Sequence, residues 1–305
     1  NPRMGQEAFS DSVAMLAEKL GWPVIADVLN PLRHHAGENP FLVTAYDTFL
    51  RDEETGAGLR PSAILQIGNL PTSKVLRTWL GSLDASSFLL SPRPVNTDPL
   101  HRVGTPIYAD VHDLAERMPH QQVDVEWSAQ WNARDQKATQ KINSRMAEEG
   151  ELFEGKVAWL LSKHLPVETP VFLASSMSVR YAEYFWQAGS RAYSVFCNRG
   201  ANGIDGTLST ALGVAHRAKP AVLLTGDLAF LHDTNGLLAA RCLQGSLTVI
   251  LINNSGGGIF ENLPIAQMEP PFESYFATPQ SINFEALTQS YGLEYERIGS
   301  WDQLI

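Results

Sequence analysis

Leu223-Leu-Thr-Gly-Asp-Leu-Ala-Phe230 and Leu247-Thr-Val-Ile-Leu-Ile-Asn-Asn-Ser-Gly-Gly-Gly258 predict a strand, a helix and a second strand in succession. Each apolar run has the composition of a buried strand, and Gly226-Asp227 ends the first run before a helical stretch from Leu228 to Leu243. A unit of this length sets its two strands parallel, with their carboxyl ends at the same edge of the sheet. Asp227 and Asn254 are therefore expected to face one crevice.

This pair of side chains predicts a magnesium site. A carboxylate, an amide oxygen and a backbone carbonyl of the glycine run form part of the six-oxygen shell that Mg²⁺ prefers, and water and phosphate oxygens usually complete it. The helix beginning near Ala229 turns its N–H groups to the same crevice, which favours a diphosphate. Either half alone is more typical of a turn or loop. The pair, 254 − 227 = 27 positions apart, resembles the Gly-Asp … Asn-Asn signature of thiamine-diphosphate enzymes, with Leu228 where glycine is common.

The order of elements predicts an α/β fold of two domains, each a mostly parallel sheet with helices on both faces. The 305 residues suffice for two cores. Residues 1–124 are predicted to form a Rossmann-like structural middle domain, and residues 125–305 the domain that binds the cofactor and magnesium. The start at Asn1 and the end at Ile305 suggest a fragment of a longer protein, truncated at both ends.

Composition and charge exclude several classes of binding partner. The net charge of −10 and the absence of Lys or Arg blocks argue against nucleic acid. No apolar run is long enough to span a membrane and no signal peptide is evident, so a cytoplasmic protein is expected. Cys197 and Cys242 are expected to be small core residues, and Arg33-His34-His35 a solvated loop rather than a metal site.

Two arginines follow predicted strands. Arg180 comes after the strand 170–175, and Arg199 after the strand 194–197, at the edge where doubly wound sheets bind ligands. Each alone is more typical of a surface ion pair, but together they favour a substrate with carboxylates. Ile204, in a glycine-flanked turn, is predicted to support a cofactor. Lys74 follows a glycine loop without a nucleotide-binding motif and is predicted to lie at the carboxyl edge of the first sheet.

Four segments occur in a characteristic order: Ser176-Met-Ser-Val-Arg180, Asn198-Arg-Gly-Ala-Asn-Gly-Ile-Asp-Gly206, Gly226-Asp-Leu-Ala-Phe-Leu-His-Asp-Thr-Asn-Gly236 and Asn253-Asn-Ser-Gly-Gly-Gly-Ile-Phe260. They resemble the motifs of the MenD family, the 2-succinyl-5-enolpyruvyl-6-hydroxy-3-cyclohexene-1-carboxylate synthases of menaquinone and phylloquinone biosynthesis. The resemblance implies a transferase in which thiamine diphosphate decarboxylates 2-oxoglutarate and the resulting carbanion adds to isochorismate.

The resemblance also implies roles for individual residues. Asp227, Asn254 and the carbonyl of Gly256 would hold Mg²⁺, or Mn²⁺ in its place. The cofactor would contact these three and Ile204, Asp205, Gly226, Leu228, Ala229, Gly257 and Ile259. Substrates would contact Ser176, Arg180, Arg199, Ile259, Phe260 and Leu263, and Lys74 would reach in from the middle domain. Val75 stands where many members have arginine.

The family's amino-terminal domain has no counterpart in these residues. That domain carries the glutamate that activates the cofactor, so no catalytic residue is assigned in this chain and the isolated fragment is expected to be inactive. A homodimer or homotetramer is expected for the full-length protein. Two alternatives stay open: a thiamine-diphosphate enzyme of the acetohydroxyacid synthase or decarboxylase type, and a non-catalytic module with a degenerate cofactor fold. The two arginines disfavour the first, and the intact Asp227 and Asn254 the second.

Overall fold

The computed structural model of the chain describes residues 2–37, 39–102, 104–121, 125–217 and 220–305. The chain forms two compact units. Unit 1 comprises Asn1–Glu148 and Gln187–Ala192, and unit 2 comprises Glu149–Trp186 and Tyr193–Ile305. The domain boundary predicted between residues 124 and 125 adjoins 122–124, which lie outside the described residues, and it stays a prediction.

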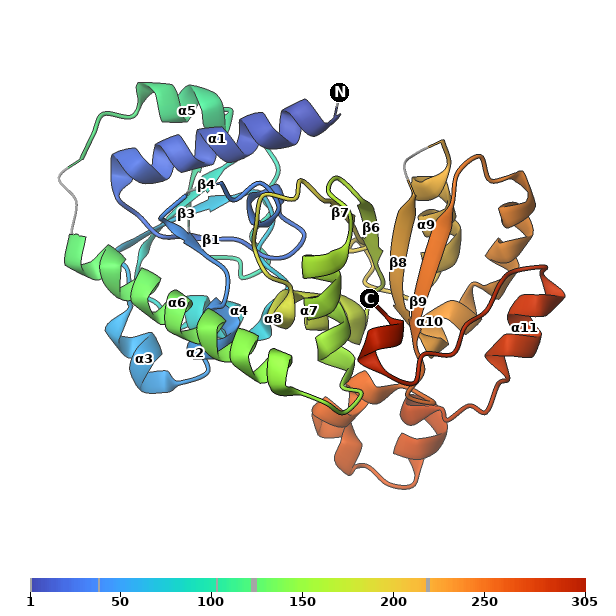
Figure 1. Cartoon of the computed structure of the whole chain (residues 1–305). Coiled ribbons are helices and arrows are strands. Elements are labelled where there is room, and N and C mark those ends of the chain that lie inside the picture. Colours follow the sequence, from blue (N-terminus) through green and yellow to red (C-terminus); the bar gives the residue numbers. More distant parts are fainter. Residues whose placement is uncertain (1, 38, 103, 122–124, 218–219) are drawn as a thin grey trace. The chain divides into compact units, whose positions relative to one another are not determined.

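The strands described in unit 1 are short and pair in parallel (Figure 1). Its elements are α1 (Pro2–Leu20), β1 (Val24–Ile25), η1 (Pro31–Arg33), β2 (Leu42–Val43), α2 (Tyr46–Phe49), α3 (Glu53–Gly58), β3 (Ala63–Ile67), α4 (Lys74–Gly81), β4 (Ser86–Leu90), β5 (Gly104–Ile107), α5 (Val111–Arg117) and α6 (Val125–Glu148). β1 pairs with β2, and β3, β4 and β5 form a second sheet in that order.

Helices cover both faces of the unit 1 strands. On one face Val13 and Leu16 of α1 and Val111 of α5 join a buried cluster with Leu90 of β4. On the other face α2, α4 and α6 contribute to a second cluster that includes Trp131, whose ring packs edge-on against Trp79 at 5.7 Å between centroids. Trp131 is a core packing residue, because its exposed fraction is 1%.

Unit 2 contains one parallel four-stranded sheet in the order β7-β6-β8-β9. Its elements are α7 (Glu154–His164), β6 (Pro170–Leu173), α8 (Met177–Phe185), β7 (Ser194–Phe196), α9 (Thr207–Ala215), β8 (Ala221–Gly226), α10 (Asp227–His232), η2 (Thr234–Cys242), β9 (Leu247–Ile252), η3 (Gly258–Asn262), η4 (Pro264–Gln267), η5 (Glu273–Ala277), α11 (Phe284–Ser290) and η6 (Trp301–Gln303). The predicted two-domain α/β fold with parallel sheets is confirmed.

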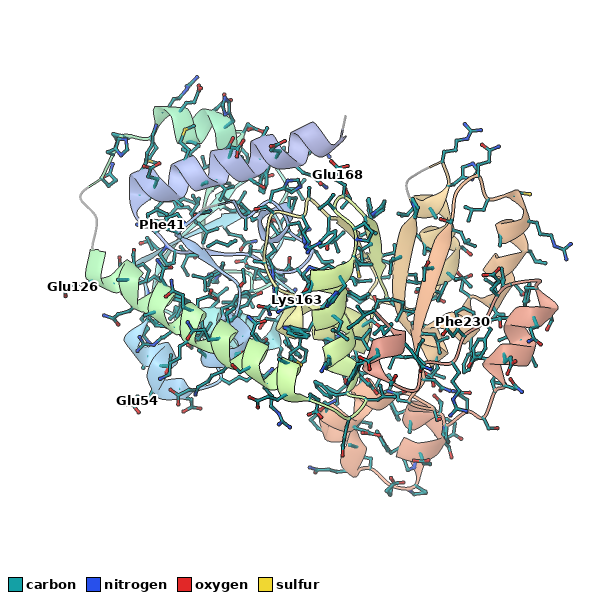
Figure 2. The ribbon with its side chains drawn as sticks, in the orientation of Figure 1. Phe41, Glu54, Glu126, Lys163, Glu168 and Phe230 are labelled. Carbon is teal, nitrogen blue, oxygen red and sulfur yellow. The ribbon has the colours of Figure 1, made fainter. Side chains whose placement is uncertain are left out.

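The core of unit 2 lies between the sheet and the helices α9, α10 and α11. Leu208 and Leu223 are fully buried there. Phe230, labelled in Figure 2, packs edge-on against Phe284 with 6.0 Å between ring centroids. Figure 1 shows α7 and α8 on the opposite face. Burial on both faces explains why β8 reads as a continuous apolar run rather than an alternating one.

The helix predicted from Leu228 to Leu243 is wrong beyond His232. α10 ends at His232, and a 3₁₀ helix follows from Thr234 to Cys242. The Asp233 carboxylate turns away to accept hydrogen bonds from the backbone N–H of Ser209 at 2.6 Å and its hydroxyl at 3.0 Å. This pairing across 24 residues breaks the local periodicity.

Two predictions about exposure are also wrong. Neither cysteine lies in the core, since Cys197 is half-buried and Cys242 is exposed. The segment Arg33-His34-His35 is not a solvated loop. Arg33 and His34 are each 2% exposed, and the His34 ring donates its Nε2–H to the carbonyl of Val28 at 2.7 Å.

Candidate active site

The crevice of interest lies at the carboxyl edge of the unit 2 sheet. From β6 the chain continues to β7 on one side, whereas from β8 it continues to β9 on the other. Ligands of doubly wound sheets bind where the connections diverge in this way, outside the carboxyl ends of the two central strands. Ser176 follows β6 and Asp227 follows β8 at this point. The topology thus brings together residues that the sequence places 51 positions apart (227 − 176).

Asp227 is a buried carboxylate at this edge, with an exposed fraction of 1%. Its Oδ1 accepts the backbone N–H of Leu228 at 2.7 Å, and its Oδ2 accepts the side-chain amide of Gln280 at 2.7 Å. Both donors are neutral, and no basic side chain in the described part of the chain pairs with this carboxylate. A buried carboxylate held only by neutral donors is a position that a cation would stabilise.

The two asparagines after β9 differ in their surroundings. The amide oxygen of Asn253 accepts the backbone N–H of Ser255 at 3.1 Å and the side-chain amide of Gln280 at 2.9 Å. The Asn254 amide lies over the glycine turn, where a Cβ on Gly258 would come within 2.9 Å of its nitrogen. Gln280 therefore links Asp227 to Asn253, while Asn254, the predicted ligand, lies one residue further along the turn.

The glycine run packs against the segment that carries Gln280. The N–H of Gly257 donates to the carbonyl of Ala277 at 2.6 Å, and the N–H of Gln280 donates to that of Ser255 at 3.1 Å. A Cβ on Gly256 would lie 2.6 Å from the Ala277 oxygen, and one on Gly257 would collide with the carbonyl of Phe276. These positions require glycine because two backbones approach too closely for a side chain.

Ser176 and Arg180 form a local pair at the start of α8. Ser176 has φ 68° and ψ −135°, a backbone conformation that non-glycine residues rarely adopt. The guanidinium of Arg180 donates to the Ser176 carbonyl at 2.6 Å. The neighbouring Ser175 hydroxyl donates to the carbonyl of Asn198, two residues past β7, at 3.1 Å. This bond ties the loops after β6 and β7 together.

The loop between β7 and α9 carries three further predicted residues. Arg199 and Ile204 are half-buried, and the Thr207 hydroxyl donates to the carbonyl of Ile204 at 2.8 Å. The Asp205 side chain is 78% exposed and lies 3.6 Å from the His232 ring nitrogen. Gly206 provides the left-handed turn, φ 62°, that starts α9. Within the described structure none of these residues forms a hydrogen bond or ion pair with Asp227, so their shared role stays a prediction.

The apolar residues predicted to line the pocket follow the glycine run. Ile259 and Phe260 belong to η3, and the Phe260 ring packs edge-on against Phe276 with 5.6 Å between centroids. Leu263 follows at 38% exposure. Lys74 belongs to unit 1, where it is the exposed first residue of α4 after the capping Ser73. Its predicted reach into the site stays a prediction.

Two models of known protein families match this chain. A model described as "Middle domain of thiamine pyrophosphate" matches residues 3–173, and one described as "Thiamine pyrophosphate enzyme, C-terminal TPP binding domain" matches residues 174–304. Thiamine pyrophosphate is another name for thiamine diphosphate. The chain belongs to the thiamine pyrophosphate enzymes.

The predicted resemblance to the MenD family is confirmed as well. A protein of a Synechococcus species named 2-succinyl-5-enolpyruvyl-6-hydroxy-3-cyclohexene-1-carboxylate synthase is 49% identical over 98% of this chain and 50% of its own length. Proteins of the same name from Microcystis aeruginosa and Trichodesmium erythraeum are 47% and 46% identical over 97% and 98% of the chain. The chain spans about half the length of these curated relatives.

The donor set suits the thiamine pyrophosphate enzymes. Among the described residues no group of three or more His, Cys, Asp and Glu side chains could share a metal ion. The predicted ligands include one carboxylate only, with an amide and a backbone carbonyl, and the buried Asp227 without a cationic partner meets that description. Such a set leaves coordination positions for phosphate oxygens, as Mg²⁺ sites in nucleotide enzymes do.

Gln280 is the site residue that the sequence did not reveal. Its amide contacts both Asp227 and Asn253, yet it follows Thr278-Pro279 in a stretch without a motif. No helical or strand periodicity marks it, and its partner Asp227 lies 53 residues away. The one sequence signal is its position directly after the aromatic and Pro-rich segment 272–279.

Proposed function

We propose that the full-length protein is a thiamine-diphosphate- and Mg²⁺-dependent enzyme of the MenD type. It would decarboxylate 2-oxoglutarate and join the remaining four-carbon unit to isochorismate, in menaquinone or phylloquinone biosynthesis. The observation that carries this proposal is the buried Asp227 carboxylate at the divergence of β6 and β8, beside the asparagines after β9. When bound, thiamine diphosphate supplies the electron sink for decarboxylating a 2-oxo acid.

In this proposal each element of the crevice has a separate task. Asp227, Asn254 and the Gly256 carbonyl would hold Mg²⁺, with Mn²⁺ as a substitute, and the ion would supply positive charge beside the diphosphate. The backbone from Gly226 to Ala229, with Ile204, Asp205, Gly257 and Ile259, contacts the cofactor. Gln280 is a positioning residue. Its amide keeps Asp227 and Asn253 in place, and it gives up the Asp227 contact when the cation arrives.

The substrate contacts in this proposal come from cationic and apolar side chains. Arg180, Arg199 and Ser176 bind carboxylates and hydroxyls, because guanidinium groups pair bidentately with carboxylates. Phe260 and Leu263 exclude water from the reacting atoms, and Lys74 adds a charge from unit 1. Val75 leaves the contribution of unit 1 to isochorismate binding smaller than in relatives with arginine there.

The full-length protein would be a cytoplasmic homodimer or homotetramer acting on small molecules. No helix in the described parts of the chain has the length and apolar character needed to cross a bilayer. We further propose that residues 1–305 alone turn over no substrate, since the glutamate that activates the cofactor belongs to another part of the protein. Measurable condensation of 2-oxoglutarate with isochorismate by the isolated chain would contradict this.

Calorimetry on the full-length protein tests the assignment of roles. Asp227→Ala should abolish Mg²⁺-dependent binding of thiamine diphosphate. Arg199→Ala should leave the cofactor Kd within about threefold and raise the KM for 2-oxoglutarate at least about tenfold. The tenfold change corresponds to about 1.4 kcal/mol, as expected for the loss of one charged hydrogen bond. Equal loss of cofactor binding in both variants would refute it. Release of carbon dioxide from pyruvate rather than 2-oxoglutarate would favour an enzyme of the acetohydroxyacid synthase type.

A further inference from the structure

The two arginines proposed to bind substrate lie on separate segments of unit 2. Arg180 belongs to α8, which follows β6, and Arg199 belongs to the loop that follows β7. β6 and β7 pair in parallel, with Phe172 beside Phe196, so both segments start at the same edge of the sheet (Figure 1). Binding of an anionic substrate there depends on how firmly the two segments are held relative to each other.

The segment after β6 is anchored to the centre of the sheet. The N–H of Ala174 donates to the carbonyl of Leu224 in β8 at 2.9 Å, and the carbonyl of Ala174 accepts the N–H of Val179 in α8 at 3.1 Å. Ser175 comes directly after Ala174 and is 2% exposed. The Ser175 side chain therefore extends from a backbone that β8 and α8 hold in place.

The hydroxyl of Ser175 fixes the start of the loop after β7. It donates to the carbonyl of Asn198 at 3.1 Å. That carbonyl belongs to the planar peptide unit that joins Asn198 to Arg199, so its direction sets the direction in which the backbone enters Arg199. Because Ser175 is buried, water has little access to replace its hydroxyl as the donor.

A second hydrogen bond holds the side chain of Asn198. Its Nδ2–H donates to the hydroxyl of Thr210 at 3.3 Å, and Thr210 belongs to α9. The residue before Arg199 is therefore held from the end of β6 through its carbonyl and from α9 through its side chain.

The other end of this loop has an anchor of its own. The hydroxyl of Thr207 donates to the carbonyl of Ile204 at 2.8 Å, and Thr207 is 1% exposed. Ile204 is a proposed cofactor contact, whereas Arg199 is a proposed substrate contact. Loosening the start of the loop should therefore change substrate binding and leave cofactor binding largely intact.

We propose that Ser175 is a positioning residue for Arg199, and that its hydroxyl holds this guanidinium where it meets a carboxylate of the 2-oxo acid substrate. The inference rests on the proposed function, in which Arg199 binds substrate. Arg199 is half-buried, and in the described part of the chain its side chain has no hydrogen-bond or ion-pair partner. The anchored backbone before it is thus what directs the side chain.

Steady-state kinetics of the full-length enzyme test the proposal. Ser175→Ala should raise the KM for 2-oxoglutarate about fivefold, the effect of one neutral hydrogen bond, and leave kcat and the cofactor Kd within about twofold. In the Arg199→Ala background the same substitution should change the KM by less than about twofold, because Ser175 acts through Arg199. An equal effect in both backgrounds would overturn the proposal.

Ser162→Ala is the matched control. Ser162 is also buried in unit 2, and its hydroxyl donates to the carbonyl of Trp159 within α7 at 2.7 Å. This variant loses a comparable bond away from the loop and should keep the wild-type KM.

A second variant keeps the test decisive if Ser175→Ala fails to fold. Asn198 is half-buried, and Asn198→Ala removes only the bond to Thr210 and should raise the KM about threefold. An unchanged KM in every soluble variant of Ser175 and Asn198, or an equal rise in Ser162→Ala, would overturn the proposal.

Failure of this proposal is distinguishable from failure of the proposed function. An enzyme that condenses 2-oxoglutarate with isochorismate and loses substrate affinity in Arg199→Ala, but not in Ser175→Ala, would refute the positioning role alone. An unchanged KM in Arg199→Ala would refute the substrate role of that arginine, and the positioning role with it.

Discussion

Replacing Gln280 with alanine separates its role in the metal-free protein from its role in the loaded enzyme. Its amide donates to the buried Asp227 carboxylate at 2.7 Å and to Asn253 at 2.9 Å. The alanine variant removes both bonds and leaves Asp227 with one remaining donor, the N–H of Leu228. The metal-free protein should lose stability, and binding of Mg²⁺ with thiamine diphosphate should restore it.

The magnitude follows from the charges and the exposure of these groups. A hydrogen bond to a charged group contributes about 1.5–3 kcal/mol. Gln280 is half-buried and water can partly replace its amide, so the lower part of this range applies. The bond to Asn253 is exposed and adds little. We expect a loss of about 2 kcal/mol in the local unfolding free energy around β8.

The same difference should appear in cofactor affinity. If Mg²⁺ displaces the Gln280 amide from Asp227, the wild-type protein breaks that bond on loading and the variant does not. The variant should then bind Mg²⁺ with thiamine diphosphate about thirtyfold more tightly, the equivalent of about 2 kcal/mol. Because the same bond sets both quantities, the loss in local unfolding free energy and the gain in cofactor-binding free energy should be equal.

Two assays on the full-length protein measure these quantities. Hydrogen exchange at the β8 amides reports local unfolding with and without ligands, which avoids assuming that two units unfold as one. Calorimetry gives the cofactor Kd at fixed Mg²⁺. Gln289→Ala is the matched control, because the Gln289 amide donates to the exposed Glu285 carboxylate at 3.3 Å and, among the residues the structure describes, to no buried group. Equal destabilisation with and without ligands, or weaker cofactor binding by the Gln280 variant, would refute the reasoning.

Three further predictions concern other parts of the chain. Burial lowers the pKa of His34 from 6.5 to about 4. Folding therefore favours the neutral ring, and the unfolding free energy of unit 1 should fall by about 3 kcal/mol as the pH falls from 6.5 to 4. In denaturation experiments the unfolding free energy of His34→Gln should depend less on pH, and an equally steep dependence would contradict this. Gly257→Ala should displace the backbone at Phe276 and Ala277 and weaken cofactor binding at least about tenfold, as measured by calorimetry. The control Gly213→Ala has open space around its Cβ, so it should bind the cofactor normally and be about 0.5–1 kcal/mol more stable. Asp233→Ala should lower the unfolding free energy by about 1–3 kcal/mol, because the N–H of Ser209 loses the carboxylate that accepts it. The amide of Ser209 should then exchange hydrogen faster, and unchanged exchange would contradict the prediction.

Local patterns in the sequence predicted much of the framework. β4 coincides with the apolar run 86–90 and β9 with the apolar run 247–252, and the Ser73 hydroxyl caps α4. These features depend on apolar runs and on side chains within three residues of the backbone groups they cap, so a short window contains the whole signal. The motifs that place Asp227 and the asparagines after adjacent strands are local in the same sense.

The features that the sequence missed depend on contacts between distant segments. β5 and α5 lack a strong periodic signal, because β5 is largely exposed and pairs only along one edge. α10 ends at His232 because Asp233 pairs with Ser209. The poor helix formers Asp233-Thr234-Asn235-Gly236 also favour an end at this point, so the predicted helix extended past a local stop signal.

The site divides in the same way. The sequence by itself determined the family, the carboxylate and amide donors, and the parallel strands that carry them, because each is written in a contiguous motif. Only the tertiary structure decided that Gln280 bridges Asp227 and Asn253, and that β1 and β3 border one cavity rather than each other. Folding brings these groups together across tens of residues, and no local pattern of charge or hydrophobicity encodes a contact over that separation.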